Sequence, residues 1–176
     1  MNTFQTITAK EFDYNPFHLI GDEWMLITAE KDGKVNTMTA SWGGLGILWN
    51  RSVAYAVIRQ SRFTKEFVDG ADHFSLSFLD HKAYAKELGY LGSVSGRDED
   101  KIKKVGVTVN HEDGVPFIDE ASKVLICEKL FVTDMKPENF IIPEIDTKFY
   151  ADKDYHHLYI GGITKILSRK ITGRHT

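Results

Sequence analysis

The amino-acid sequence predicts a mainly β protein with helical insertions. Short segments that are apolar or that alternate between apolar and polar residues recur along the 176-residue chain, which is the pattern of strands. Segments with helical spacing are few and short, and they lie between the strands. The motif KDGK at residues 31–34 is a tight turn between two of the strands. Together these features are typical of a small barrel with helical insertions.

The predicted strands are recognised by their period of two or by continuous apolar character. They are residues 24–30, the segment from Val35 onward, and residues 52–59, 73–79, 107–109, 123–133 and 157–167. In the turn that joins the first two strands, Gly33 can take a positive φ. The predicted helices are residues 61–69, residues 81–89 and a third that begins near Asp98.

The helix predicted over residues 61–69 has signals at both ends. Ser61 can cap its first turn, Phe63 and Phe67 share one face, and Gly70 can close it. Asp98 is the predicted cap of the third helix, because acidic residues there precede several lysines in the order that a helix dipole favours.

Composition and charge exclude several classes of function. With 42% hydrophobic residues and no linker or repeat, residues 1–176 are expected to form a single domain. A formal charge of -3 argues against binding to nucleic acid or to an anionic membrane. No leader-like or membrane-spanning run is visible, so a cytoplasmic location is expected. The single cysteine, Cys127, lies in an apolar strand and is expected to be buried and inert.

The first candidate site is the segment NTMTASWGGLG, residues 36–46. In a regular strand its hydroxyl residues share one face and its apolar residues the other. The hydroxyl face is Thr37, Thr39 and Ser41, and the opposite face is Met38, Ala40 and Trp42. Glycines at positions 43, 44 and 46 permit positive φ and let backbone N–H groups approach a ligand. A solvent-facing strand followed by a glycine turn is the alternative explanation.

The second candidate site is RQSRFTK, residues 59–65, at the start of a predicted helix. The first-turn N–H groups of a helix have no intrahelical partner, and the helix dipole places partial positive charge beside them. Such a start binds phosphate well. Arg59, Ser61, Arg62 and Thr64 could add charge-assisted hydrogen bonds to a dianion. The alternative is that Ser61 only caps the helix and that the cations are solvated.

A planar ring beside a phosphate explains both segments, and flavin mononucleotide (FMN) has this form. The chain resembles the flavin reductase-like family, whose fold is an FMN-binding split β-barrel, and especially its flavoredoxin-type branch. The resemblance is carried in order by LITA, GKVNTMTASWGGLG, VAYAVIRQSRFTKEFV and HFSLSFL, and it continues through residues 93–101 and 157–161. It covers nearly the whole chain.

The resemblance implies a homodimer that binds FMN non-covalently and usually takes electrons from NAD(P)H as a transient reductant. Carried over by position, the residues that line the flavin are Thr39, Ala40, Ser41 and Trp42, and those that hold the phosphate are Arg59, Ser61, Arg62 and Thr64. Trp49, which follows the glycines, would border the ring or the ribityl chain. Because the flavin carries the hydride chemistry, no side-chain nucleophile is required.

Some residues and roles stay open at this level. No zinc-like spacing connects His157 with the other histidines, so no metal site is predicted, and His157 is a candidate on the flavin or substrate side. Arg97 and Lys101 could contact the flavin or a nicotinamide phosphate. Three functions remain: an NAD(P)H-dependent flavin reductase, a flavoredoxin-like carrier reduced by a redox protein partner, and a flavin-binding module without turnover.

Overall fold

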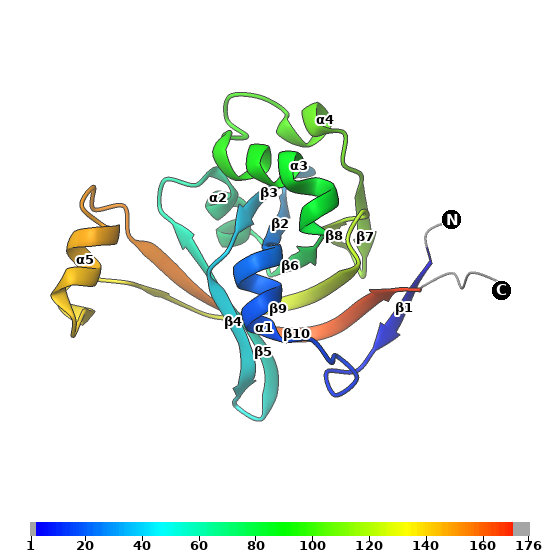
Figure 1. Ribbon diagram of the computed structural model, residues 1–176, viewed down its shortest axis with the longest axis horizontal. Helices are drawn as coiled ribbons and strands as arrows, with labels where there is room; N and C mark the ends of the chain where they lie inside the picture. The colour runs from blue at the N-terminus through cyan, green and yellow to red at the C-terminus, as the bar shows by residue number, and fades with distance from the viewer. Residues whose placement is uncertain (1–2, 171–176) are drawn as a thin grey trace.

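A computed structural model describes residues 3–170, and the fold is mainly β with short helices, as predicted (Figure 1). The strands are β1 (Phe4–Ile7), β2 (Met25–Lys31), β3 (Lys34–Ala40), β4 (Gly43–Leu48), β5 (Arg51–Arg59), β6 (His73–Phe78), β7 (Val109–Glu112), β8 (Val115–Ile118), β9 (Lys123–Asp134) and β10 (His156–Arg169). The α-helices are α1 (Pro16–His18), α2 (Phe63–Gly70), α3 (His81–Ser93), α4 (Lys101–Val105) and α5 (Pro143–Phe149). The predicted domain 1–176 includes residues 1–2 and 171–176, which lie outside the described residues.

The main sheet is antiparallel, with the strand order β3-β2-β6-β9-β10-β5-β4, and β1 pairs with β10. A separate two-stranded sheet contains β7 and β8. Within residues 3–170, no pairing joins β3 to β4, so backbone hydrogen bonds do not close the sheet into a barrel. Only Ser41 and Trp42 separate these two edge strands in the sequence. The chain therefore crosses from one edge of the open sheet to the other at these two residues.

Two tight turns fix the register of the hairpins on either side of this crossing. Asp32 and Gly33 have φ of 52° and 73° between β2 and β3, which confirms the turn predicted at KDGK. Trp49 and Asn50 have φ of 51° and 55° between β4 and β5. Positive φ at both central residues matches the twist of a two-residue hairpin.

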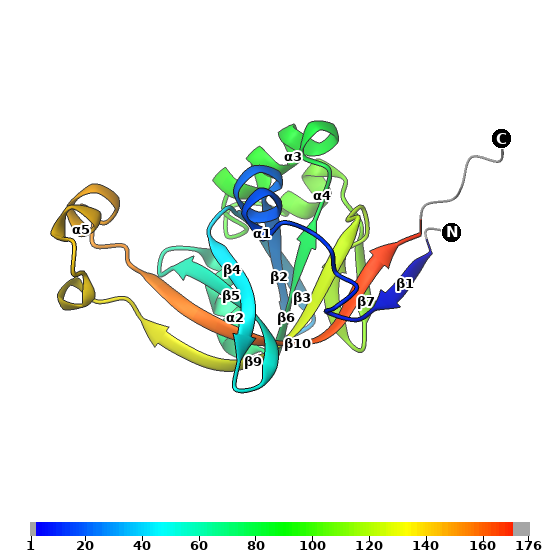
Figure 2. The same ribbon diagram turned by 60° about the horizontal axis from the view of Figure 1, so that its bottom comes forward.

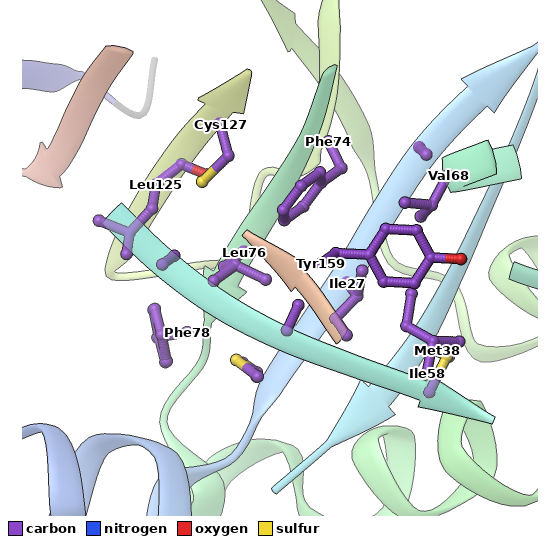
Figure 3. Packing of buried hydrophobic residues seen from close by; sticks show 14 of the residues in the cluster. Ile27, Met38, Ile58, Val68, Phe74, Leu76, Phe78, Leu125, Cys127 and Tyr159 are labelled. Carbon is purple, nitrogen blue, oxygen red and sulfur yellow. The ribbon is translucent and has the colours of Figure 1, made fainter. Parts of the chain in front are cut away.

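The core lies between the sheet and the helices that cover it, and Figure 3 shows its aromatic centre. The ring of Tyr159 on β10 packs with Ile27, Val68 and Ile58, which come from β2, α2 and β5. Each such side chain contributes about 1.5–3 kcal/mol when fully buried. Cys127 belongs to the same cluster, so its predicted burial is confirmed, and this burial raises the pKa of its thiol far above the ordinary range.

An arm extends from the body of the protein. The ends of β9 and β10 run away from the rest of the sheet and carry α5 between them (Figures 1 and 2). The backbone N–H of Met135 donates to the carbonyl of His156 at 3.1 Å, which pairs the two strands at the base of the arm. Beyond this base the arm exposes large apolar side chains, including Ile141 and Ile142.

Helix ends are where the sequence-based predictions needed most correction. Ser61 does not cap α2: the cap position is Arg62, and no side chain there bonds to the helix. Gly70 is the last helical residue rather than a left-handed cap. Asp98 does not cap α4, because Asp100 accepts the hydrogen bond from the backbone of Lys103 at 3.1 Å. Nearby side chains and tertiary contacts decide between candidate caps that local sequence leaves equal.

The strand predicted at residues 107–109 begins only at Val109. Before it, Gly106 ends α4 in the left-handed conformation, and the backbone N–H of Thr108 donates to the carboxylate of Glu120. The prediction also missed elements that lack a clear periodic pattern, namely β1, β4, β8, α1 and α5. Among the described residues, no helix is long and apolar enough to cross a membrane.

Candidate functional site

The end of β3, the crossing, β5 and the first residue of β10 enclose a pocket of about 230 Å³, here called the strand-end pocket. It is lined by Met38, Thr39, Ala40, Ser41, Trp42, Val57, Arg59, Arg62 and His156. The antiparallel register places His156 directly opposite Arg59. This pocket therefore gathers the first candidate segment and part of the second at the open side of the sheet.

A smaller pocket of about 90 Å³ lies at the start of α2, and we call it the helix-start pocket. It is lined by Asn36, Ser61, Arg62, Phe63, Thr64, Ser93, Val94, Ser95, Gly96 and Lys101. The lining contains two cations and four hydroxyl groups. Within the described residues, no Asp or Glu side chain lines this pocket. Such a donor set suits an anion. Arg62 lines both pockets and so connects them.

The end of α3 holds the side chain of Arg62 in place. Its Nη1 donates to the carbonyl oxygen of Gly92 at 2.6 Å, at the end of α3. Burial lowers the pKa of the Arg62 guanidinium, and the carboxylate of Asp154 partly offsets this shift. An arginine stays charged at neutral pH even after such a shift. The guanidinium is therefore an oriented positive charge between the two pockets.

Lys101 is the second cation of the helix-start pocket, and only 3% of it is exposed. Its Nζ donates to the carbonyl oxygens of Leu91 at 2.8 Å and Val94 at 2.9 Å. An ammonium has three donors, so one further donor is available to a ligand in the pocket. Burial, together with the positive charge of Arg62, lowers the pKa of Lys101 to about 8. An anion in the pocket would stabilise the charged form.

Most of the hydroxyl groups on the face predicted for residues 37–41 form hydrogen bonds within the protein. Thr37 is fully buried, and its hydroxyl donates to the carbonyl of Ile27 at 3.1 Å. The hydroxyl of Thr39 donates to the carbonyl of Leu88 at 2.6 Å. The strand stops at Ala40, so Ser41 lies outside its regular alternation. Side-chain hydroxyls therefore contribute less to this pocket than the sequence pattern predicted.

The glycines after the crossing, which the sequence predicted as positive-φ positions open to a ligand, belong to a strand. Gly43, Gly44 and Gly46 belong to β4, and of these only Gly43 has a positive φ, 153°. A Cβ at Gly43 would lie 2.4 Å from the carbonyl oxygen of Tyr55, and at the other two it would touch the Tyr55 ring. A side chain is therefore excluded at Gly43, whereas at Gly44 and Gly46 a Cβ would make only ordinary contact with Tyr55.

The histidine at the strand-end pocket is His156, and the structure does not bring the predicted His157 into it. The Nδ1 of His156 forms a 2.7 Å hydrogen bond with the hydroxyl of Tyr150. Burial, followed by the positive charge of Arg59, lowers the pKa of His156 to about 4, so the ring is neutral at pH 7. His157 instead points its Nδ1 toward Asp134 at 3.2 Å. Neighbouring residues of a strand face opposite sides, and the sequence alone left the register undecided.

The remaining predicted residues are divided between the two pockets and the surface. Arg59 lines the strand-end pocket, where its guanidinium also donates to the carbonyls of Asp154 at 2.8 Å and Phe149 at 3.0 Å. Thr64 lines the helix-start pocket, and its hydroxyl accepts a 2.9 Å hydrogen bond from Asn36. Trp49 lies in neither pocket, because it occupies the β4–β5 turn, 55% exposed.

Arg97 also lies outside both pockets. It donates to the carbonyl of Ser61 at 3.1 Å, pairs with Glu66 and stacks its guanidinium over the ring of Phe63. Ser93 and Ser95 were not predicted as site residues, because they become neighbours of α2 only through the packing of α3 on β3. Among residues 3–170, no group of three or more His, Cys, Asp or Glu side chains could hold a metal ion.

The comparison with family models decides the classification. The model described as the flavin reductase like domain matches residues 17–167. The chain belongs to the flavin reductase-like family. A comparison with curated proteins gave no significant match.

Solved structures with the same fold agree with this family assignment. An FMN-binding domain of a flavin reductases-like enzyme from Shewanella baltica OS155 matches with a TM-score of 0.70 and 19% identity, over 99% of this chain and 81% of that chain. Flavoredoxin from Methanosarcina acetivorans matches with a TM-score of 0.65 and 21% identity, over 84% and 69%. An FMN-binding protein from Thermus thermophilus matches with a TM-score of 0.66 and 22% identity, over 99% and 86%.

Proposed function

We propose that this member of the flavin reductase-like family binds FMN non-covalently and acts as an NAD(P)H-dependent flavin reductase. The observation that carries the proposal is that the two pockets meet at Arg62 and differ in chemistry. The strand-end pocket, with the indole of Trp42 and neutral His156, suits a planar ring. The helix-start pocket, with Arg62 and Lys101, suits a phosphate.

The donors present fit such a ligand without further residues. Arg62, Lys101 and the hydroxyls of Ser61 and Thr64 would hold the phosphate, together with the first N–H groups of α2. Backbone groups of residues 39–42 would line the ring, since the hydroxyl of Thr39 is already bonded within the protein. When bound, FMN supplies hydride and electron transfer, and the protein supplies position and electrostatics.

The same proposal includes a homodimer in which a second copy covers the strand-end pocket. The pocket, at about 230 Å³, is smaller than the roughly 300–1,000 Å³ usual for ligands of this class. Large apolar side chains stand exposed beside it, with Trp42 at 44% and Phe17 at 87%. Light scattering coupled to gel filtration measures the mass directly, and a monomer of 20.0 kDa at working concentration would refute this part.

Reduction of the bound flavin distinguishes the reductase from the two other functions that the sequence left open. The protein, loaded with FMN and kept free of oxygen, is mixed with NADH or NADPH while the flavin absorbance is followed. Rapid bleaching supports a reductase. Bleaching by a reduced redox protein but not by NADH or NADPH supports a flavoredoxin-like carrier, and the chain shares the fold of flavoredoxin. If neither a nicotinamide nor a redox protein bleaches the flavin, the result supports a module without turnover. Failure to bind any FMN would refute all three.

A further inference from the structure

Asp154 makes two hydrogen bonds to a residue of the helix-start pocket. It lies just before β10, and its Oδ1 accepts the backbone N–H of Ser61 at 3.0 Å. Its Oδ2 accepts the hydroxyl of the same serine. A hydroxyl has one proton, so while Ser61 donates to Asp154 it cannot donate to a ligand. The carboxylate thus engages donors that an anion in the pocket would use.

The backbone around Asp154 is fixed in this position by further contacts. Its carbonyl accepts a 2.8 Å hydrogen bond from Arg59, and its N–H donates to the carboxylate of Asp152 at 3.1 Å. The carbonyl of the next residue, Tyr155, accepts the N–H of Gln60. The carboxylate is therefore held against the start of α2 by the base of the arm rather than extended into solvent.

We propose that Asp154 is an internal anion that competes with the flavin phosphate for Ser61 and so keeps FMN exchangeable. This inference rests on the proposed function, because it takes the helix-start pocket as the phosphate site. It makes Asp154 an affinity-limiting residue of that site. A weakened grip suits a protein that hands on reduced flavin more than one that retains it.

The electrostatics around Asp154 point in the same direction. Its negative charge acts on Arg62, whose pKa it raises against the larger effect of burial. It therefore offsets part of the positive charge that holds a phosphate, and it repels a dianion directly. Riboflavin has the same ring without the phosphate, so neither effect applies to it. The competition is thus specific to phosphorylated flavin.

Substitution of Asp154 by Asn tests the competition with little change of shape. The amide oxygen can still accept the Ser61 N–H, whereas the amide N–H₂ now donates to the Ser61 hydroxyl, which frees that hydroxyl's proton for a ligand. Dissociation constants for FMN and riboflavin are measured by flavin fluorescence at fixed salt. For Asp154→Asn we expect FMN to bind roughly tenfold more tightly and riboflavin to change less than about twofold.

The matched control is Asp152→Asn, which removes the same charge from an exposed carboxylate 3.8 Å from Arg59 and keeps an amide oxygen that can still accept the Asp154 N–H. Its FMN affinity should change less than about threefold, because an exposed charge is screened. In a Ser61→Ala background, the gain from Asp154→Asn should shrink, since the two residues are coupled. If Asp154→Asn does not fold by thermal melting, Asp154→Ser replaces it.

Three results would overturn the inference: FMN affinity unchanged or lower in the folded variant, an equal gain for riboflavin, or an equal gain in Asp152→Asn. The last would mean that only the overall charge matters. Each of these leaves the proposed function standing, because the wild-type protein still binds FMN. Absence of FMN binding in both the wild-type protein and Asp154→Asn would refute the proposed function and this inference together.

Discussion

Replacing Arg62 by Ala should weaken FMN binding in a protein that still folds. A charge-assisted hydrogen bond contributes about 1.5–3 kcal/mol, so its loss corresponds to a roughly 10- to 150-fold lower affinity. The guanidinium also donates to the carbonyl of Gly92, and losing that bond should cost about 1.5–3 kcal/mol of folding stability as well. Lys101 and the start of α2 remain, so binding should be weakened and not abolished.

The assay compares two ligands and two variants. Dissociation constants of FMN and riboflavin are measured by flavin fluorescence for Arg62→Ala and for Arg51→Ala, and thermal melting confirms that both fold. Arg51 is the matched control, because it is exposed at the start of β5 and its guanidinium is 3.9 Å from Glu128. The reasoning is refuted if FMN affinity is unchanged in Arg62→Ala, or if riboflavin loses as much affinity as FMN.

Other predictions follow from single residues. Because the Lys101 pKa is lowered to about 8, FMN affinity should fall as pH rises above about 8, and titrations of Lys101→Met should lack this fall. The pKa of His156 drops on folding from 6.5 to about 4, so the stability tied to its neutral ring is present above pH 6.5 and lost toward pH 4; melting curves of His156→Gln should depend less on pH in that window. Gly43→Val should lower stability by about 1–3 kcal/mol in denaturant titrations, since its Cβ meets the Tyr55 carbonyl at 2.4 Å. Ser41→Ala should change FMN affinity less than Gly43→Val does; the reverse order would contradict a grip made by the backbone.

Residue patterns predicted the strands well where alternation is strong. The segments that became β2, β5, β6, β9 and β10 were placed within a few residues of their observed ends. The helix predicted over residues 61–69 lies within two residues of the observed α2, and the rings of Phe63 and Phe67 pack 4.9 Å apart, as their spacing predicted. Periodicity predicts these elements because each of them buries one face, and burial of one face sets the spacing of apolar residues along the segment.

Predictions failed where a side chain had several possible partners. Ser61 was interpreted as a helix cap, yet it binds Asp154, which is 93 positions further along the chain. The glycines at positions 43, 44 and 46 were interpreted as positive-φ residues whose backbone N–H groups approach a ligand, yet they belong to β4, which pairs with β5 next to Tyr55. In both cases a partner that is distant in the sequence replaces the local interaction, and the neighbouring residues do not identify that partner.

The sequence by itself determined the mainly β fold, the family, and the two segments, residues 36–46 and 59–65, that supply most of the strand-end pocket and half of the helix-start pocket. Only the tertiary structure decided that Arg62 joins the pockets, that His156 and not His157 faces the strand-end pocket, and that Lys101 completes the helix-start pocket. The physical reason is that periodicity fixes which face each segment buries. Strand register and the packing of α3 against β3 then bring distant residues together, and these depend on the whole chain.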